Sequence, residues 1–301
     1  MLFNVCALYI KIMNNENQTI HKSNDNLTIY GWNEKLNQLK QESIYSTLAH
    51  GRVSIVHRTC YEVISGNGLF QCELTGNMMY GKSDDELPCT GDWVIFQPFD
   101  EHKGIIVDRL PRERTLYRKK SGTVADKQAI ASYVDKAFIV QSLDDNFNVR
   151  RVERFMVQIM EENISSVLVL NKADLDFDRQ SVEEQIKHIS SQIPVFFTSI
   201  HQLETIVRLR KSISEGETVV FVGSSGVGKS SLVNALCGES VLLTSDISLS
   251  TGKGRHTSTR REMVLMDGSG VLIDTPGVRE FGLAIDDTDS LAEVLEISDY
   301  A

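Results

Sequence analysis

The sequence feature that most constrains the fold is a glycine-rich segment between a predicted strand and a predicted helix. The segment fits the pattern G-x-x-x-x-G-K-[ST] and consists of Gly223, Ser224, Ser225, Gly226, Val227, Gly228, Lys229 and Ser230. Residues 218–222 before it are β-branched or apolar, and residues 229–237 after it fit a helix. Such a loop turns backbone N–H groups toward phosphate oxygens, and the helix N-terminus adds partial positive charge. The segment, called the phosphate loop below, therefore predicts a nucleotide site, which we extend to Ser231.

The second half of the chain alternates strand and helix patterns, which predicts a parallel sheet with helices on both faces. Strands are expected over residues 137–141, 166–170, 195–198, 218–222 and 270–273, and helices over residues 150–163, 182–192 and 229–237. In such folds ligands bind at the carboxyl ends of the strands. Polar motifs directly after these strands are therefore candidate ligand-binding groups.

Two of these strand ends indicate the base that is bound. Asn171, Lys172, Ala173 and Asp174 follow the strand over 166–170 and resemble the guanine-reading NKxD motif of GTPases. The carboxylate of Asp174 can accept hydrogen bonds from the N1–H and 2-amino groups of guanine, which adenine does not offer. Thr198 and Ser199 resemble a weaker element that supports the base. The motif excludes an ATP-dependent enzyme and predicts GTP and GDP as ligands.

A third strand end supplies the expected magnesium site. Asp274, Thr275, Pro276 and Gly277 resemble the DxxG motif, in which the aspartate holds Mg²⁺ and the glycine N–H senses the γ-phosphate. In the phosphate loop, Lys229 is expected to reach the β- and γ-phosphates, and the Ser230 hydroxyl is expected to ligate Mg²⁺. We therefore assign Ser230 and Asp274 to Mg²⁺.

The order of these motifs is permuted. The guanine motif begins 52 residues before the phosphate loop, whereas ordinary GTPases carry it last. A site is a spatial arrangement, so the chain order can change if the original termini lie close together. We predict a circularly permuted P-loop GTPase domain over residues 133–290.

The first half has a different organisation. Five short strands are expected over residues 52–57, 59–64, 69–74, 92–97 and 104–108. They predict a small closed barrel over residues 46–115, of which the RNA-binding OB-fold is one form and an SH3-like unit another. Residues 1–45 form a polar N-terminal extension with a short helix near residues 34–45, and residues 116–132 are expected to be a linker.

The net charge of −10 is unevenly distributed over the 301 residues. Residues 1–120 are balanced, so the whole excess of acid falls in residues 121–301, while residues 109–120 carry a local charge of +5. This basic stretch is a candidate for RNA contact that weakens with salt, and the alternative is a solvated linker. Five dispersed cysteines predict a reducing cytoplasmic compartment. No apolar run reaches the roughly 18 residues of a membrane span, and we expect a monomer without membrane contact.

Taken together, residues 30–301 resemble the bacterial RsgA/YjeQ-type GTPases, which depend on the small ribosomal subunit. The more specific segments are GRHTST at residues 254–259 and DTPGVREFG at residues 274–282. The resemblance implies that the barrel is an OB-fold that binds rRNA. It also implies a late role in maturing the small (30S) subunit, with GTP hydrolysis stimulated by that subunit.

The same resemblance suggests the catalytic groups. Val278 occupies the position of the water-orienting glutamine of Ras-like enzymes and cannot replace it. His256 is the candidate for this role, with Lys229 and the Gly277 N–H as the other catalytic groups, and the alternative for His256 is a loop residue that faces phosphate or RNA. Either Thr257 or Ser258 is expected to complete the Mg²⁺ ligands.

One departure from the family concerns zinc. The family carries a C-terminal zinc domain, but no cysteine follows Cys237, so we expect no zinc site in this chain and take residues 291–301 as the start of a truncated segment. This keeps a second function open, an RNA-binding module that holds GTP but hardly hydrolyses it.

Overall fold

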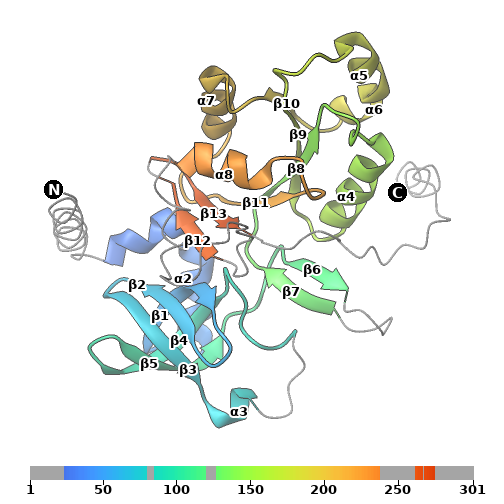
Figure 1. Ribbon diagram of the computed structural model, residues 1–301. Helices are drawn as coiled ribbons and strands as arrows, with labels where there is room; N and C mark the ends of the chain where they lie inside the picture. The colour runs from blue at the N-terminus through green and yellow to red at the C-terminus, as the bar shows by residue number, and fades with distance from the viewer. Residues whose placement is uncertain (1–23, 80–84, 120–126, 238–261, 267, 275–301) are drawn as a thin grey trace, which may run out of the picture.

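The computed structural model describes residues 24–79, 85–119, 127–237, 262–266 and 268–274. In these residues a small barrel and a larger layered unit are joined through one eleven-stranded sheet (Figure 1). The strand order is β10-β9-β8-β11-β13-β12-β1-β2-β3-β5-β4, and an additional β1–β4 pairing closes the barrel.

The barrel contains β1 (Ala49–Val56), β2 (Tyr61–Ser65), β3 (Gly68–Leu74), β4 (Trp93–Asp100) and β5 (Lys103–Arg109). The β3–β5 pair is parallel and the other pairs are antiparallel. Side chains along β3 alternate between buried and exposed, as a strand with one face in a core requires. This closed five-stranded arrangement, with the short helix α3 (Gly76–Met79) between β3 and β4, is an OB-type barrel and confirms the predicted fold class.

Part of the polar N-terminal extension packs onto the barrel. The 3₁₀ helix η1 (Asn24–Tyr30) precedes α2 (Glu34–Glu42), and the Asn33 side chain caps α2 by accepting from the N–H of Leu36. Leu27 and Leu36 are buried in one cluster with Trp93 of β4. The short helix expected near residues 34–45 is therefore present and covers the barrel.

The segment after the barrel differs from its prediction. A linker is expected over residues 116–132, but β6 (Leu116–Lys119) and β7 (Lys127–Ala131) form an antiparallel pair there. Leu116, Ile130 and Ala131 are fully buried, and Leu116 and Ala131 belong to the largest core cluster. The hydrophobic burial of these few residues outweighs the basic, loop-like composition of the segment.

The larger unit contains five parallel strands and one antiparallel strand. They are β8 (Lys136–Ser142), β9 (Ser165–Asn171), β10 (Val195–Thr198), β11 (Thr218–Val222), β12 (Glu262–Leu265) and β13 (Val271–Asp274). β12 pairs antiparallel with β13 and also meets β1 of the barrel, where Ile55 is opposite Glu262. The other pairings are parallel, as predicted from the alternation of strands and helices.

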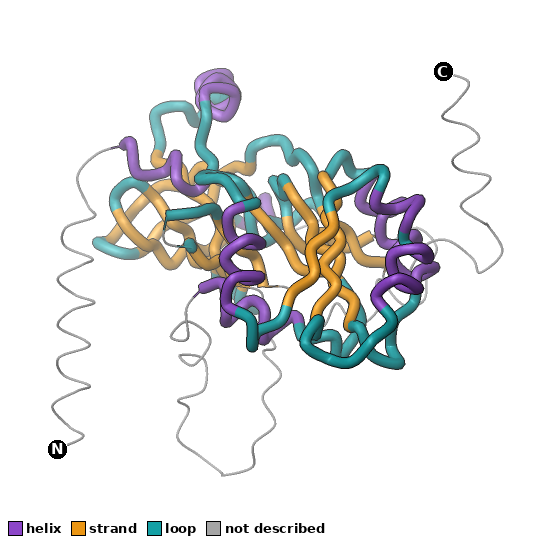
Figure 2. Tube along the Cα trace, turned by 90° about the horizontal axis from the view of Figure 1, so that it is seen from above, coloured by secondary structure: helices purple, strands orange, loops and turns teal. Residues whose placement is uncertain are grey.

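Helices cover both faces of this sheet (Figure 2). On one face, α4 (Val149–Glu161), α5 (Arg179–Gln185) and α6 (Lys187–Ser190) pack onto the first core cluster. On the other, α7 (Leu203–Lys211) and α8 (Lys229–Cys237) pack onto the second. Neighbouring side chains of one strand point to opposite faces, so Phe138 of β8 joins the second cluster while Ile139 joins the first. The single helix expected over residues 182–192 is divided at Ile186.

Candidate nucleotide-binding site

Three predicted motifs follow strands that run in the same direction. Asn171 ends β9, Gly223 follows β11, and Asp274 ends β13. β9, β8, β11 and β13 are consecutive parallel strands, so their carboxyl ends lie along one edge of the sheet. The fold therefore places at one edge motifs that are far apart in the chain, as the permuted order requires.

The phosphate loop has a backbone that only glycine tolerates at two positions. Gly223 has φ +147°, and a Cβ there would lie 2.3 Å from the carbonyl oxygen of Val140. Gly228 has φ +95°, and its Cβ would lie 2.3 Å from Nδ2 of Asn171. Any side chain at either position would displace the loop from β8 or from the guanine motif. α8 begins directly after Gly228, which places a helix N-terminus at the loop.

The ammonium of Lys229 lies within the phosphate loop. Its Nζ donates hydrogen bonds to the carbonyl oxygens of Gly223 and Ser224, each at 2.7 Å. Ser225, Gly226 and Ser230 are exposed around it. This donor set, an ammonium, a serine hydroxyl and a helix N-terminus, has the chemistry that binds a phosphate chain.

The guanine motif is attached to the phosphate loop by a buried hydrogen bond. Asn171 is 3% exposed, and its Nδ2 donates to the carbonyl oxygen of Val227 at 2.8 Å. Its Oδ1 accepts from the Thr198 hydroxyl at 3.3 Å, and the N–H of Ala173 donates to the Thr198 carbonyl at 2.9 Å. The structure thus brings Asn171, Ala173, Thr198 and Val227 together as the sequence predicts.

Lys172 has an acidic partner, Asp144, that the guanine motif does not include. Its Nζ lies 2.7 Å from Oδ2 of Asp144. The other carboxylate oxygen, Oδ1, accepts from the Ser142 hydroxyl at 2.6 Å and from the Asn146 N–H at 3.0 Å. Partial burial raises the pKa of Asp144, but the hydrogen bonds from Lys172, Ser142 and the Asn146 backbone outweigh it and lower the pKa to about 2. Asp144 follows the end of β8, next to both motifs. Because ligands bind at the carboxyl ends of parallel strands, its position after β8 could have indicated this role from the sequence.

The carboxylate of Asp174 is exposed and ready to accept hydrogen bonds. The Ser199 hydroxyl donates to it, and together with the nearby backbone and His201 this lowers the pKa of Asp174 below its usual value. Ser199 is itself buried and held by Thr205 of α7, whose hydroxyl accepts from the Ser199 N–H at 3.0 Å. An ionised acceptor on a fixed support is what recognition of guanine N1–H and 2-amino groups needs.

The predicted Mg²⁺ ligands are only partly within the described residues. Asp274 lies at the end of β13 opposite Glu262, and Ser230 is exposed in the first turn of α8. Burial, with the charges of Glu62 and Asp274, raises the pKa of Glu262. His256, Thr257, Ser258 and Gly277 lie outside the described residues. Within the described ranges, no group of three or more His, Cys, Asp or Glu side chains could hold a metal ion.

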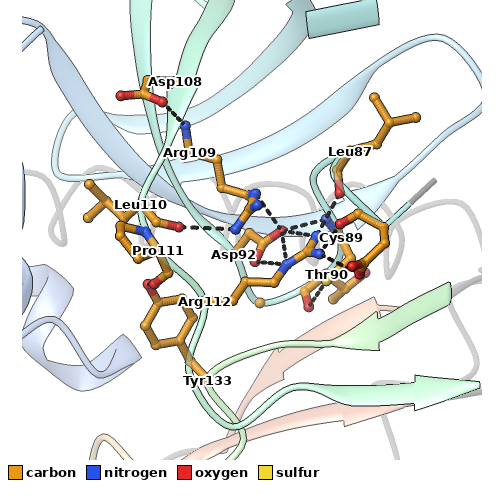
Figure 3. A network of polar contacts seen from close by, with 12 residues as sticks. Leu87, Cys89, Thr90, Asp92, Asp108, Arg109, Leu110, Pro111, Arg112 and Tyr133 are labelled. Atoms are coloured by element: carbon orange, nitrogen blue, oxygen red, sulfur yellow. Dashed lines mark hydrogen bonds and ion pairs between the residues drawn. The ribbon is translucent and has the colours of Figure 1, made fainter. Parts of the chain in front are cut away.

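The basic stretch after the barrel has a structural role (Figure 3). The Arg112 side chain is 8% exposed, and its Nη2 lies 2.7 Å from Oδ2 of the fully buried Asp92. Arg112 also contacts Asp85, and Arg109 lies 4.0 Å from the same Asp92 oxygen. Arg114 pairs with Asp135 at 3.0 Å. These ion pairs give the three arginines a structural role, and the alternative of a solvated linker is wrong for Arg112. RNA contact by this stretch stays a prediction.

Comparison with known proteins agrees with this geometry. The RsgA GTPase family model matches residues 109–284. A small ribosomal subunit biogenesis GTPase RsgA 1 of Bacteroides thetaiotaomicron is 75% identical over 278 residues, which cover 92% of this chain and 78% of that protein. A small ribosomal subunit biogenesis GTPase RsgA of Methanosarcina acetivorans is 37% identical over 281 residues, 90% of this chain and 74% of the relative.

Two solved structures share the fold. The crystal structure of YjeQ from Thermotoga maritima has a TM-score of 0.59 at 22% identity, covering 84% of this chain and 93% of that one. The structure of YloQ, described as a circularly permuted GTPase, has a TM-score of 0.56 at 21% identity, covering 80% and 75%.

The fold and the site define a circularly permuted GTPase: an OB-type barrel precedes a sheet in which the guanine motif comes before the phosphate loop in the chain. The match over residues 109–284 and the 75% identity to a curated member then specify the family. The chain belongs to the RsgA GTPases.

Proposed function

We propose that this chain hydrolyses GTP in the cytoplasm as a late maturation factor of the small (30S) ribosomal subunit, which stimulates the hydrolysis. The observation that carries the proposal is the 2.8 Å hydrogen bond from Asn171 of the guanine motif to Val227 of the phosphate loop. It unites base recognition and phosphate binding in one site. The relatives named small ribosomal subunit biogenesis GTPases support the choice of partner.

Each part of the nucleotide is assigned to its own group of residues. Asp174 reads the guanine edge, supported by Asn171, Lys172, Ala173, Thr198 and Ser199. Residues 223–231 hold the phosphates, with Lys229 at the β- and γ-phosphates. Ser230, Asp274 and either Thr257 or Ser258 would hold Mg²⁺, and all of them offer the oxygen donors that this ion prefers. When bound, Mg²⁺ neutralises charge on the phosphates.

Hydrolysis needs a group that orients the attacking water, and His256 is assigned to it. Imidazole changes its charge near neutral pH, so it can accept from water or donate to developing negative charge. The Gly277 N–H is assigned to the γ-phosphate. Val278, in the usual glutamine position, has no polar side chain. This supports a mechanism in which the bound subunit completes the site.

RNA contact is assigned to the barrel. Phe99 is 61% exposed near the turn between β4 and β5, and His102 and Lys103 at the same turn are exposed too. An exposed aromatic ring with a neighbouring cation suits base stacking and phosphate contact. None of the helices in the described ranges has the length and apolar character of a membrane span. The protein is expected to act as a monomer.

The test is a GTP hydrolysis assay with the purified chain, alone and with purified small subunits, at fixed salt. Large subunits serve as the control for general RNA effects. Strong stimulation by small subunits alone supports the proposal. Slow turnover that small subunits do not change would instead favour an RNA-binding module that holds GTP without switching.

A further inference from the structure

Strand β1 of the barrel contacts two strands of the GTPase sheet, β11 and β12. From its middle, the Arg52 side chain reaches the start of β11, the strand that leads into the phosphate loop. Near its end, Ile55 pairs with Glu262 of β12, and Glu262 in turn is opposite Asp274 of β13. Contacts from β1 therefore lead to the strand before the phosphate loop and, through β12, to the assigned Mg²⁺ ligand Asp274.

Arg52 joins four separate segments from a buried position. Its side chain is 1% exposed, and its Nη1 donates to the Thr218 hydroxyl at 2.8 Å and to the Tyr30 carbonyl. Its Nε donates to the Gly91 carbonyl at 3.0 Å, and Nη2 lies 3.4–3.5 Å from the carbonyl oxygens of Tyr133 and Ser132. One guanidinium thus contacts the N-terminal extension, the barrel, the residues that follow β7, and the GTPase sheet.

Every direct acceptor of this buried cation is neutral. Burial lowers the pKa of Arg52 to about 10, while Asp135 and Asp92 act against the shift, so the guanidinium stays charged at neutral pH. A core that only needed packing would use an apolar side chain here. The planar fork of arginine instead fixes the relative positions of several backbones.

The contact to Thr218 is suited to transmit displacement. Thr218 is the first residue of β11, all five residues of β11 are buried, and Gly223 follows the last one. Beside Arg52 lies a cavity of about 270 Å³, lined among others by Lys35, Glu113 and Asp135. This space leaves the junction room to rearrange, which a filled core would not.

We propose that Arg52 is a positioning residue that couples the barrel to the phosphate loop through its hydrogen bond to Thr218. Nucleotide binding then makes the β1 backbone less mobile. By reciprocity, a ligand on the barrel changes the conformation of the phosphate loop. The second half of this statement rests on the proposed function, because there the barrel ligand is the ribosomal subunit. The first half needs only the nucleotide.

The experiment compares Thr218→Val, which removes only the acceptor hydroxyl, with Thr218→Ser, which keeps it. Ser54→Ala is the matched control, because it removes a buried β1 hydroxyl that bonds within the barrel to the Glu62 carbonyl. Amide hydrogen exchange of the full chain is measured with and without GDP. We expect GDP to slow exchange in residues 49–56 about fivefold in the wild type, Thr218→Ser and Ser54→Ala, and less than about twofold in Thr218→Val.

A second measurement separates this inference from the proposed function. Thr218→Val is expected to hydrolyse GTP at the wild-type basal rate without subunits. Its stimulation by small subunits is expected to be about fivefold weaker than that of the wild type. A wild-type chain without stimulation would overturn the proposed function, while the exchange data would still decide the coupling. An unchanged β1 response in Thr218→Val, or no β1 response to GDP in the wild type, would overturn the role of Arg52.

Discussion

The side-chain amide of Asn171 donates a 2.8 Å hydrogen bond to the carbonyl oxygen of Val227 and so attaches the guanine motif to the phosphate loop. Asn171 is buried, so its loss leaves the Val227 carbonyl without this partner in a dry position. Asn171→Ala is expected to lower the free energy of unfolding by about 1–3 kcal/mol and to weaken GTP and GDP together, about tenfold or more.

Urea denaturation and nucleotide titration check this prediction. Asn234→Ala is the control, because Asn234 is an exposed residue of α8, the helix that follows the loop. Selective loss of GTP with normal GDP binding would contradict the prediction, since the bond positions both loops whichever nucleotide is bound.

Asp174→Asn is expected to change the base preference from guanine to xanthine. The wild-type carboxylate is assigned to accept from two donors of guanine, whereas an asparagine amide also donates and so matches the additional carbonyl of xanthine. GTP affinity should fall by two orders of magnitude or more, about 10²–10⁴-fold, and XTP should become the better ligand. Competition of GTP, XTP and ATP against a labelled nucleotide measures this. Asp176→Asn, at an exposed position of the same loop, should keep the wild-type order.

His256→Ala is expected to separate binding from stimulated turnover. Removal of a general acid–base group costs about 10²–10⁴-fold in rate without affecting the ground-state phosphate contacts. GTP affinity should therefore stay unchanged while hydrolysis with small subunits falls toward the basal rate. His188→Ala, on the surface near Glu153, is the control. Normal stimulated hydrolysis in His256→Ala would assign the water-orienting role to another group.

The sequence predicts the strand and helix on either side of the phosphate loop well because their local signals are strong. β11 and α8 have the bounds that the pattern indicates, since an apolar strand, three glycines and a helix leave few other conformations. The parallel sheet then brings together loops whose separation in the chain carries no information about distance. Asp144 is missed because its role depends on Lys172 from a neighbouring strand end.

The basic stretch shows the limit of composition as evidence. Six cations in twelve residues favour a solvated or RNA-facing segment, yet three of the arginines pair with acids from elsewhere. Asp92, directly before β4, pairs with Arg109 and Arg112, and Asp135, directly before β8, pairs with Arg114. Charge counts along the chain cannot identify such partners, because pairing depends on tertiary contacts. The hairpin of β6 and β7 is missed for the same reason.

Arg112→Met is expected to be strongly destabilising because it leaves Asp92 as a buried charge. Asp92 is fully buried and would keep the hydrogen bond from the Cys89 N–H at 2.7 Å, but its nearest remaining cation would be Arg109 at 4.0 Å. Breaking such a pair costs about 3–5 kcal/mol, which chemical denaturation measures directly. Glu183→Gln breaks the exposed pair with Arg179 and keeps the Arg179 guanidinium over the Phe197 ring, so it should cost less than about 0.5 kcal/mol. Equal effects of the two substitutions would contradict the structural role assigned to Arg112.

Because His50 is partly buried, the free energy of unfolding is expected to fall in mild acid. Its ring lies 4.1 Å, centroid to centroid, from that of Trp32, and burial, with the charge of Lys40, lowers the pKa of His50 from 6.5 to about 4. Between these values the unfolded chain binds more protons than the folded one, so stability rises with pH. The contribution is complete above pH 6.5 and is lost as the pH falls toward 4.

His50→Phe should remove this pH dependence while keeping the ring against Trp32. Discounted for partial exposure of the ring, the wild type should lose about 1–2 kcal/mol more than His50→Phe between pH 7 and pH 4.5. Urea denaturation at a series of pH values measures the difference, with His188→Gln as the surface control. Parallel curves for wild type and His50→Phe would mean that His50 becomes protonated in the folded chain as readily as in the unfolded one. The packing against Trp32 would then not exclude the imidazolium.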